Sequence, residues 1–151
     1  LTYKQLKPYL GKVKVFIQNK RNYYIETLYS HYKHTHHVIH LEETRKIIEK
    51  RYPQYLKIYD EVILHRYGYM FNMMIMEKSY LNEYCSWLFD ILFELEKTLD
   101  IKELSAFQAR CYGRISEIIF NVWLEYQKKN GRLNQNQIKE IPCIHIEKID
   151  W

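Results

Sequence analysis

The chain has 151 residues, 47% of them hydrophobic, which is enough for one domain with a buried core and too short for two domains of ordinary size. Its formal net charge of +5 is spread along the sequence, and the longest basic clusters are pairs, so no basic arm or stripe indicates a dedicated DNA-binding protein. No apolar run approaches the roughly 20 residues that a membrane-spanning helix needs. The chain begins with Leu and shows no signal peptide, so we expect a piece of a longer protein. Its three cysteines lack metal-ligand spacing, which favours reduced side chains of a cytosolic protein.

In chain order, the first half of the sequence predicts a strand followed by three helices. The strand covers residues 13–18, and Asn22 then caps a helix whose apolar side chains recur at helical spacing, namely Ile25, Leu28, Tyr29 and Tyr32. A polar stretch rich in histidine ends where Leu41 opens a second helix with two glutamates in its first turn. Because Pro53 disfavours helical geometry in the residue before it and can start a helix, the second helix ends near Tyr52 and a third begins there.

Residues 67–77 form an apolar run that carries one amide, Asn72. Such a run, bounded by Gly68 and by Lys78, predicts a strand buried on both faces. A buried amide without a hydrogen-bond partner would cost about 1 to 3 kcal/mol, so a partner is required. The sequence leaves two partners open, a backbone group of a loop or a substrate.

The next predicted helix is capped by Ser79. It carries a long apolar stripe with further large apolar side chains beside it, so we expect it to pack on more than one side and to support the fold from its centre. The stripe consists of Leu81, Cys85, Leu88, Leu92, Leu95 and Leu99.

The last predicted helix opens at Ser105, which has capping-box spacing with Gln108, and it ends at Asn130 before a glycine. We expect Gly113 to lie where a side chain would obstruct a close neighbour or a ligand. Residues 141–147 then predict a second apolar strand.

The sequence lacks several signatures of nucleotide and hydrolase sites. Its four glycines form no phosphate-binding loop, and its aspartates form no Asp-x-Asp pair. A Gly-x-Ser-x-Gly nucleophile elbow is also missing, which leaves covalent hydrolase chemistry with little support.

Glu117 is the candidate general base, because it lies between Arg114 and Asn121 on the polar face of the last predicted helix. The alternative is that Glu117 forms only a surface ion pair with Arg114 or Arg110. Gln108 could contact a ligand or only cap the helix, and Arg110 could clamp a phosphate or remain solvated.

Five histidines lie close together between residues 31 and 40. The spacing of three of them would suit zinc on a helix, but no carboxylate or cysteine stands nearby to complete a tetrahedral site. A solvated loop is the second interpretation. The third is that one or two imidazoles, with Lys20 and Arg21, contact a phosphate or a sugar hydroxyl, and His34 and His37 are the candidates for that contact.

Eight stretches of the sequence form a pattern of fixed order and spacing: RNYY at 21–24, YKHTHH at 32–37, RYP at 51–53, FNMMIM at 71–76, YCSWLFDIL at 84–92, FQAR at 107–110, GRISE at 113–117 and FNVWL at 120–124. This pattern resembles the bacterial domain of unknown function 4422, which is found in capsule and exopolysaccharide glycosyltransferases. The resemblance covers roughly residues 20–151 and concerns the C-terminal part of that domain.

The resemblance implies a helix-rich α/β fold, the C-terminal part of a GT-A-like nucleotide-sugar transferase fold in which long amphipathic helices pack a few strands. Residues 1–151 would form a single domain, the C-terminal portion of a longer glycosyltransferase domain, and would be inactive as this fragment alone. A divalent cation, Mn²⁺ or Mg²⁺, would be bound mainly by the preceding part of that domain. No residue of this chain is predicted to bind metal.

The implied reaction transfers a hexose from a nucleotide-sugar donor to a lipid-linked intermediate of capsular polysaccharide, exopolysaccharide or lipopolysaccharide. The enzyme would be cytoplasmic, at the inner face of the plasma membrane with peripheral contact to it, and would have no nucleic-acid partner. Asn72 would lie beside the donor sugar, and Gln108 and Arg110 would hold donor or acceptor groups.

A function of another class stays open from the residues alone. The basic balance and the 15 tyrosines would also suit a non-catalytic helical module that binds nucleic acid or protein. Most tyrosines occupy apolar helical positions, however, so core packing accounts for them better than base stacking.

Overall fold

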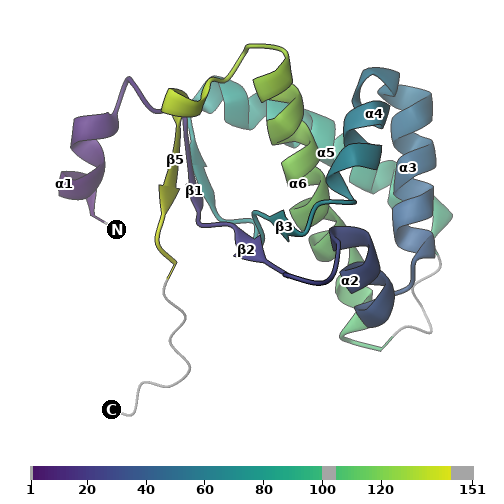
Figure 1. The fold of residues 1–151 in the computed structure, drawn as a ribbon. Helices are drawn as coiled ribbons and strands as arrows, with labels where there is room; N and C mark the ends of the chain where they lie inside the picture. Colours follow the sequence, from purple (N-terminus) through teal and green to yellow (C-terminus); the bar gives the residue numbers. More distant parts are fainter. Residues whose placement is uncertain (1, 100–104, 144–151) are drawn as a thin grey trace.

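The computed structural model describes residues 2–99 and 105–143, which form a three-stranded sheet, a two-stranded ribbon and a group of packed helices (Figure 1). The sheet has the order β4-β1-β5, with β4 antiparallel and β5 parallel to the central strand β1, and the ribbon pairs β2 with β3. The strands are β1 (Val15–Gln18), β2 (Arg21–Asn22), β3 (Tyr67–Gly68), β4 (Met74–Met76) and β5 (Ile138–Ile141).

The helices α3 to α6 pack together on one side of the sheet in Figure 1, whereas α1 lies beyond β5. The helical segments are α1 (Tyr3–Leu6), η1 (Lys7–Tyr9), α2 (Leu28–Thr35), α3 (Ile39–Arg51), α4 (Pro53–Val62), α5 (Lys78–Thr98), η2 (Gln108–Arg110), α6 (Cys111–Lys129) and η3 (Gln135–Gln137). Among the described residues, no helix is both long enough and apolar enough to cross a bilayer.

The central helix of the fold is α6 rather than α5, so the expectation that α5 supports the fold from its centre was wrong, although α5 does pack on more than one side, against α3 and α6. In α6 every residue from Ile115 to Leu124 is buried. In α5, Phe89 and Phe93 are 47% and 60% exposed, and only Leu88 and Leu95 of the predicted stripe are buried. The buried side of α5 is rotated from the predicted stripe toward Tyr84, Trp87 and Ile91.

The apolar run 67–77 is not one strand buried on both faces. It holds the short strands β3 and β4, which belong to different sheets, and a turn between them. Phe71 and Asn72 form the turn with φ of 75° and 48°, in the left-handed region. The run could not be recognised as a turn from its residues, because a phenylalanine at positive φ is rare and has to be held there by other parts of the fold.

Three of the predicted helix boundaries are confirmed, whereas α5 begins at Lys78 rather than after Ser79, and α6 begins at Cys111 rather than after Ser105. α3 ends at Arg51 and α4 begins at Pro53, while Gly131, with φ of 69°, follows the end of α6. The predicted cap Asn22 was wrong, because it lies in β2, and Thr27 caps α2 instead by accepting a hydrogen bond from the Ser30 backbone N–H at 3.1 Å. The last strand is β5, earlier in the chain than predicted, and residues 144–147 lie outside the described residues.

A buried amide on α6 ties the helix to the chain segment that follows β3. The Asn121 Oδ1 accepts a hydrogen bond from the Tyr69 N–H at 2.7 Å, and its Nδ2 donates to the Tyr69 carbonyl at 3.0 Å. The same Nδ2 donates to the Glu117 carbonyl of its own helix at 2.8 Å. A Cβ at Gly68 would come within 3.4 Å of this amide, so glycine lets the strand approach α6 closely. A Cβ at Gly113, by contrast, would meet nothing within 4 Å, so the predicted crowding there was wrong.

The Asn121→Ala variant should lose about 1 to 3 kcal/mol of unfolding free energy, because the buried Tyr69 N–H and carbonyl would be left without partners. Urea or guanidinium denaturation measures the loss. Asn130→Ala is the matched control, since this exposed amide at the end of the same helix donates only to the Tyr126 carbonyl, and it should change the stability by no more than about 0.5 kcal/mol. Equal stability of the two variants would contradict the structural role of Asn121.

Candidate functional site

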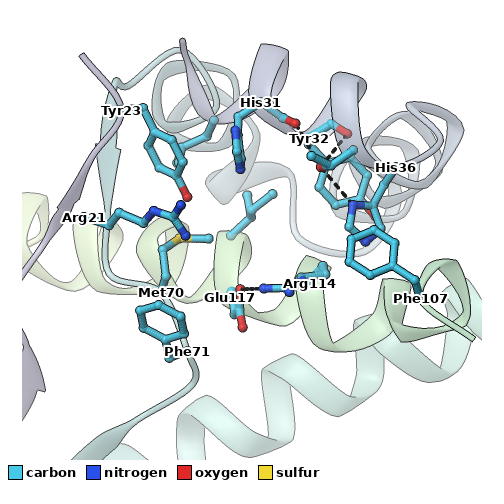
Figure 2. Close-up of a pocket in the computed structure, with 13 residues that line it drawn as sticks. Arg21, Tyr23, His31, Tyr32, His36, Met70, Phe71, Phe107, Arg114 and Glu117 are labelled. Atoms are coloured by element: carbon cyan, nitrogen blue, oxygen red, sulfur yellow. Dashed lines mark hydrogen bonds and ion pairs between the residues drawn. The ribbon is translucent and has the colours of Figure 1, made fainter. Parts of the chain in front are cut away.

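A hollow of about 160 Å³ lies between α2 and the first half of α6 (Figure 2). Side chains from the β2 end, from α2, from the turn after β3 and from the segment before η2 complete its walls. The lining combines cationic, acidic, imidazole and aromatic groups, of which Arg21, His31, His36, Phe71, Arg114 and Glu117 are the most chemically distinct. It is therefore a small site in which charged groups and flat apolar surfaces face one another.

Glu117 lies in this wall and is 7% exposed. Its Oε2 lies 3.2 Å from the Nη1 of Arg114, one turn earlier on α6, and Figure 2 shows both side chains at the base of the hollow. The ion pair that the sequence offered as the alternative to a catalytic role is thus present, but it lies in the wall of the hollow and its carboxylate is buried. The guanidinium balances a carboxylate that would otherwise be costly to bury.

Asn72 does not line this hollow, although its neighbour Phe71 does. Its exposed side chain reaches the first turns of α6, where Nδ2 donates to the Gly113 carbonyl at 3.1 Å and to the Ser116 Oγ at 2.8 Å. Its amide therefore has protein partners. A non-glycine residue at positive φ costs about 1 to 3 kcal/mol, and these hydrogen bonds stabilise the left-handed turn against that cost. The turn directs the Phe71 ring toward the hollow. Asn72 itself faces a second, shallower hollow at the sheet edge with Gln18.

Two histidines that line the hollow were not among the predicted contacts. The structure places His31 and His36 there, whereas His37 is exposed and the side chain of His34 is 67% exposed. For His31 the signal was the spacing from Leu28, since residues three positions apart share a helical face. His36 lies outside this pattern, because it directly follows Thr35, the last residue of α2.

The segment around η2 contributes a residue other than those predicted. Gln108 is half-buried and Arg110 exposed, and neither lines the hollow. Phe107 does, with its ring 4.9 Å from the ring of His36. The Ser105 Oγ accepts a hydrogen bond from the Gln108 N–H at 3.3 Å, which is one half of the predicted capping box. The helical segment nevertheless begins at Gln108 with Phe107 at its N-cap, so the prediction that Ser105 opens the helix was wrong.

His36 is the most buried imidazole of the site. Its Nδ1 lies 3.0 Å from the Thr35 Oγ1, and its buried Nε2 has no hydrogen-bond partner within the described part of the chain. Burial lowers the pKa of His36 below its ordinary value of 6.5, and the nearby charge of Arg114 lowers it further. The imidazole is therefore neutral at neutral pH, and its unpaired nitrogen is buried.

A metal has no evident ligands in this part of the molecule. Within residues 2–99 and 105–143, no three side chains of His, Cys, Asp or Glu cluster so that they could hold an ion. The described residues do not fit the divalent cation that the resemblance implies, and no chemical step is assigned to it.

Comparison with known proteins places the chain in a family. The model of the domain of unknown function DUF4422 matches residues 1–129, which is most of the chain. The chain belongs to the DUF4422 family. The expected family is thus confirmed, although the match starts and ends earlier than the predicted range 20–151. No curated protein matches the sequence.

This DUF4422 chain is also similar to a solved structure, the apo form of WbbM, described as a bifunctional glycosyltransferase. The TM-score is 0.81 at 25% identity, and the match covers 89% of this chain but 24% of the WbbM chain. The chain therefore spans about a quarter of the length of that protein. The match confirms the helix-rich α/β fold expected for part of a GT-A-like transferase and supports a glycosyltransferase-like role.

The free energy of unfolding should decrease as the pH falls from about pH 7 to about pH 5. Part of the decrease comes from His36, because its imidazole binds a proton more readily in the unfolded chain than in the folded one. At pH values above the pKa of His36 in the unfolded chain, the lowered pKa does not affect the free energy of unfolding. Below that pKa, the loss of unfolding free energy grows as the pH falls. Denaturation at several pH values should show a shallower slope for His36→Gln than for the unmodified protein. An unchanged slope would mean that His36 titrates normally in the folded state.

Proposed function

We propose that this chain is part of a glycosyltransferase that transfers a hexose from a nucleotide-sugar donor to a lipid-linked intermediate of capsular polysaccharide, exopolysaccharide or lipopolysaccharide. The hollow between α2 and α6 is the observation that carries the proposal. It combines a buried carboxylate, cations and aromatic rings in a chain of the DUF4422 family that is similar to part of a glycosyltransferase.

The chemistry of the hollow suits sugar phosphates. The rings of Tyr23, Phe71 and Phe107 offer apolar faces to the C–H surface of a sugar, and Arg21 and Arg114 offer donors to phosphate oxygens. Its volume of about 160 Å³ lies below the roughly 300 Å³ at which pockets for drug-sized ligands begin. The hollow therefore suits one part of the donor, a sugar ring or a phosphate group, rather than a complete nucleotide sugar.

In the proposed reaction, Glu117 takes the proton of the acceptor hydroxyl as that oxygen attacks the anomeric carbon. Arg114 keeps the Glu117 carboxylate in place beside the reacting atoms. Asn72, Gln108 and Arg110 are proposed to contact donor or acceptor groups near the hollow, since each lies within three positions of a lining residue. His34 and His37, which face solvent, are proposed contacts only for parts of a ligand that extend beyond the hollow.

The cellular setting is likewise a proposal. A lipid-linked acceptor would bring the enzyme to the inner face of the plasma membrane, where a net charge of +5 favours an anionic lipid surface. Mn²⁺ or Mg²⁺, if required, would depend on ligands supplied by other parts of the protein.

The nucleic-acid alternative gains no support from the described basic side chains, several of which are paired with carboxylates. The guanidinium of Arg45 contacts Asp60 through two nitrogens, and Arg132 contacts Glu83 in the same way. Paired guanidinium groups contribute less to an electrostatic surface for phosphates than free ones do.

The Glu117→Gln variant of the full-length enzyme should transfer hexose about 100-fold more slowly, because the amide cannot accept the hydroxyl proton. Turnover with a panel of UDP-glucose, UDP-galactose and GDP-mannose is the measurement, and thermal unfolding checks that the variant remains folded. Glu96→Gln, an exposed change on α5, is the control and should transfer at the normal rate. Near-normal transfer by Glu117→Gln would remove Glu117 from the role of base.

A further inference from the structure

One carboxylate, Glu26, contacts two imidazoles of α2. Its Oε2 lies 2.7 Å from the Nδ1 of His31, and its Oε1 lies 2.5 Å from the Nδ1 of His34. These hydrogen bonds lower the pKa of Glu26, so the group is charged at neutral pH. With both oxygens engaged, the carboxylate is held in one orientation.

The contact with Glu26 determines which nitrogen of His31 carries a proton. A charged carboxylate can only accept hydrogen bonds, so the proton of the pair lies on Nδ1 of His31. The remaining nitrogen, Nε2, can then exchange a proton with a ligand. A carboxylate on Nδ1 also fixes the orientation of the ring, as in carboxylate–histidine pairs of hydrolases.

The ring of His31 is directed into the hollow. It packs against the ring of Tyr23 at 4.4 Å between centroids, and the guanidinium of Arg21 lies 5.1 Å from the centre of the same tyrosine ring. Figure 2 shows His31 pointing into the hollow from α2, while Glu117 and Arg114 approach from α6. An imidazole and a carboxylate therefore face the same space from opposite walls.

We propose that Glu26 and His31 form an acid dyad, in which His31 donates its Nε2 proton to the leaving diphosphate while Glu26 orients and stabilises the imidazolium. The assignment rests on the proposed function. His34 is a positioning residue in this scheme, because it occupies the second oxygen of Glu26.

The proton and electron changes of the step balance. The acceptor oxygen forms a bond to the anomeric carbon and loses its proton to Glu117. The bond from the anomeric carbon to the phosphate oxygen breaks with its electron pair on that oxygen, which receives the proton from His31. His31 becomes neutral and Glu117 protonated, and exchange with water restores both groups after the products leave.

Two variants of the full-length enzyme separate an acid role from a structural one. In His31→Asn, the side-chain amide can replace Nδ1 as the donor to Glu26, but nothing replaces Nε2. In Glu26→Gln, the imidazole remains while the charge that stabilises the imidazolium is lost. Each should lower kcat about 100-fold or more with little change in KM, using whichever of UDP-glucose, UDP-galactose and GDP-mannose the unmodified enzyme transfers. The control is Glu42→Gln, an exposed change on α3, which should behave as the unmodified enzyme does.

A second measurement is independent of turnover. In protein labelled with ¹⁵N at histidine, inorganic pyrophosphate should shift the Nε2 resonance of His31, which the His31→Asn spectrum identifies by its absence. Normal kcat in His31→Asn would overturn the dyad and leave the proposed function standing. If the unmodified enzyme transfers none of the three sugars, the proposed function fails, and the pyrophosphate titration still decides the assignment, since an unshifted His31 resonance would overturn it.

Discussion

The hydrogen bonds between Asn121 and the backbone of Tyr69 are the constraint on which the rest of the candidate site depends. They connect the most buried part of α6 to the chain just after β3, a position that has no partner in either sheet. Two residues further on, the chain makes its left-handed turn at Phe71 and Asn72. Because Asn121 holds the start of this segment and the first turns of α6 hold Asn72, the turn is anchored at both ends to one helix.

This arrangement explains why polar side chains lie within a buried helix. Ser116, Glu117 and Asn121 are each costly to bury alone, and each has a hydrogen-bonding partner in the structure. Two of the three bind the segment that walls the hollow, and the third forms its base. A helix with apolar residues at these positions would leave the Tyr69 backbone without its partners, and it would define neither the turn nor the carboxylate at the wall.

The features that could be predicted from the sequence are those determined by residues close to one another in the chain. Pro53 marks a helix boundary, a glycine follows the end of α6, and Glu117 lies between polar neighbours at helical spacing. The family was also recognisable from its motifs, because their order and spacing can be read from the sequence without knowing which residues are in contact.

What the sequence could not predict depends on contacts between distant segments. The apolar run around Asn72 matched a buried strand, yet the hydrogen bonds from α6 support a turn there and leave its apolar side chains for the hollow and the surface. The buried face of α5 was misjudged because packing against α3 and α6 decides which side of the helix is covered, and that side carries Tyr84, Trp87 and Ile91. His31 and His36 were missed because which side chains of this segment reach the hollow depends on how α2 lies against α6 and, for His36, on the end of α2 at Thr35.

The central claim is that the hollow between α2 and α6 binds part of a nucleotide-sugar donor. Mapping NMR chemical-shift changes on addition of UDP-glucose, UDP-galactose or GDP-mannose tests it most directly. The account predicts that the largest changes cluster at Arg21, His31, Phe107 and Arg114. Changes confined to the separate hollow at the sheet edge, around Gln18, Met73 and Ile141, or no change with any donor, would contradict it.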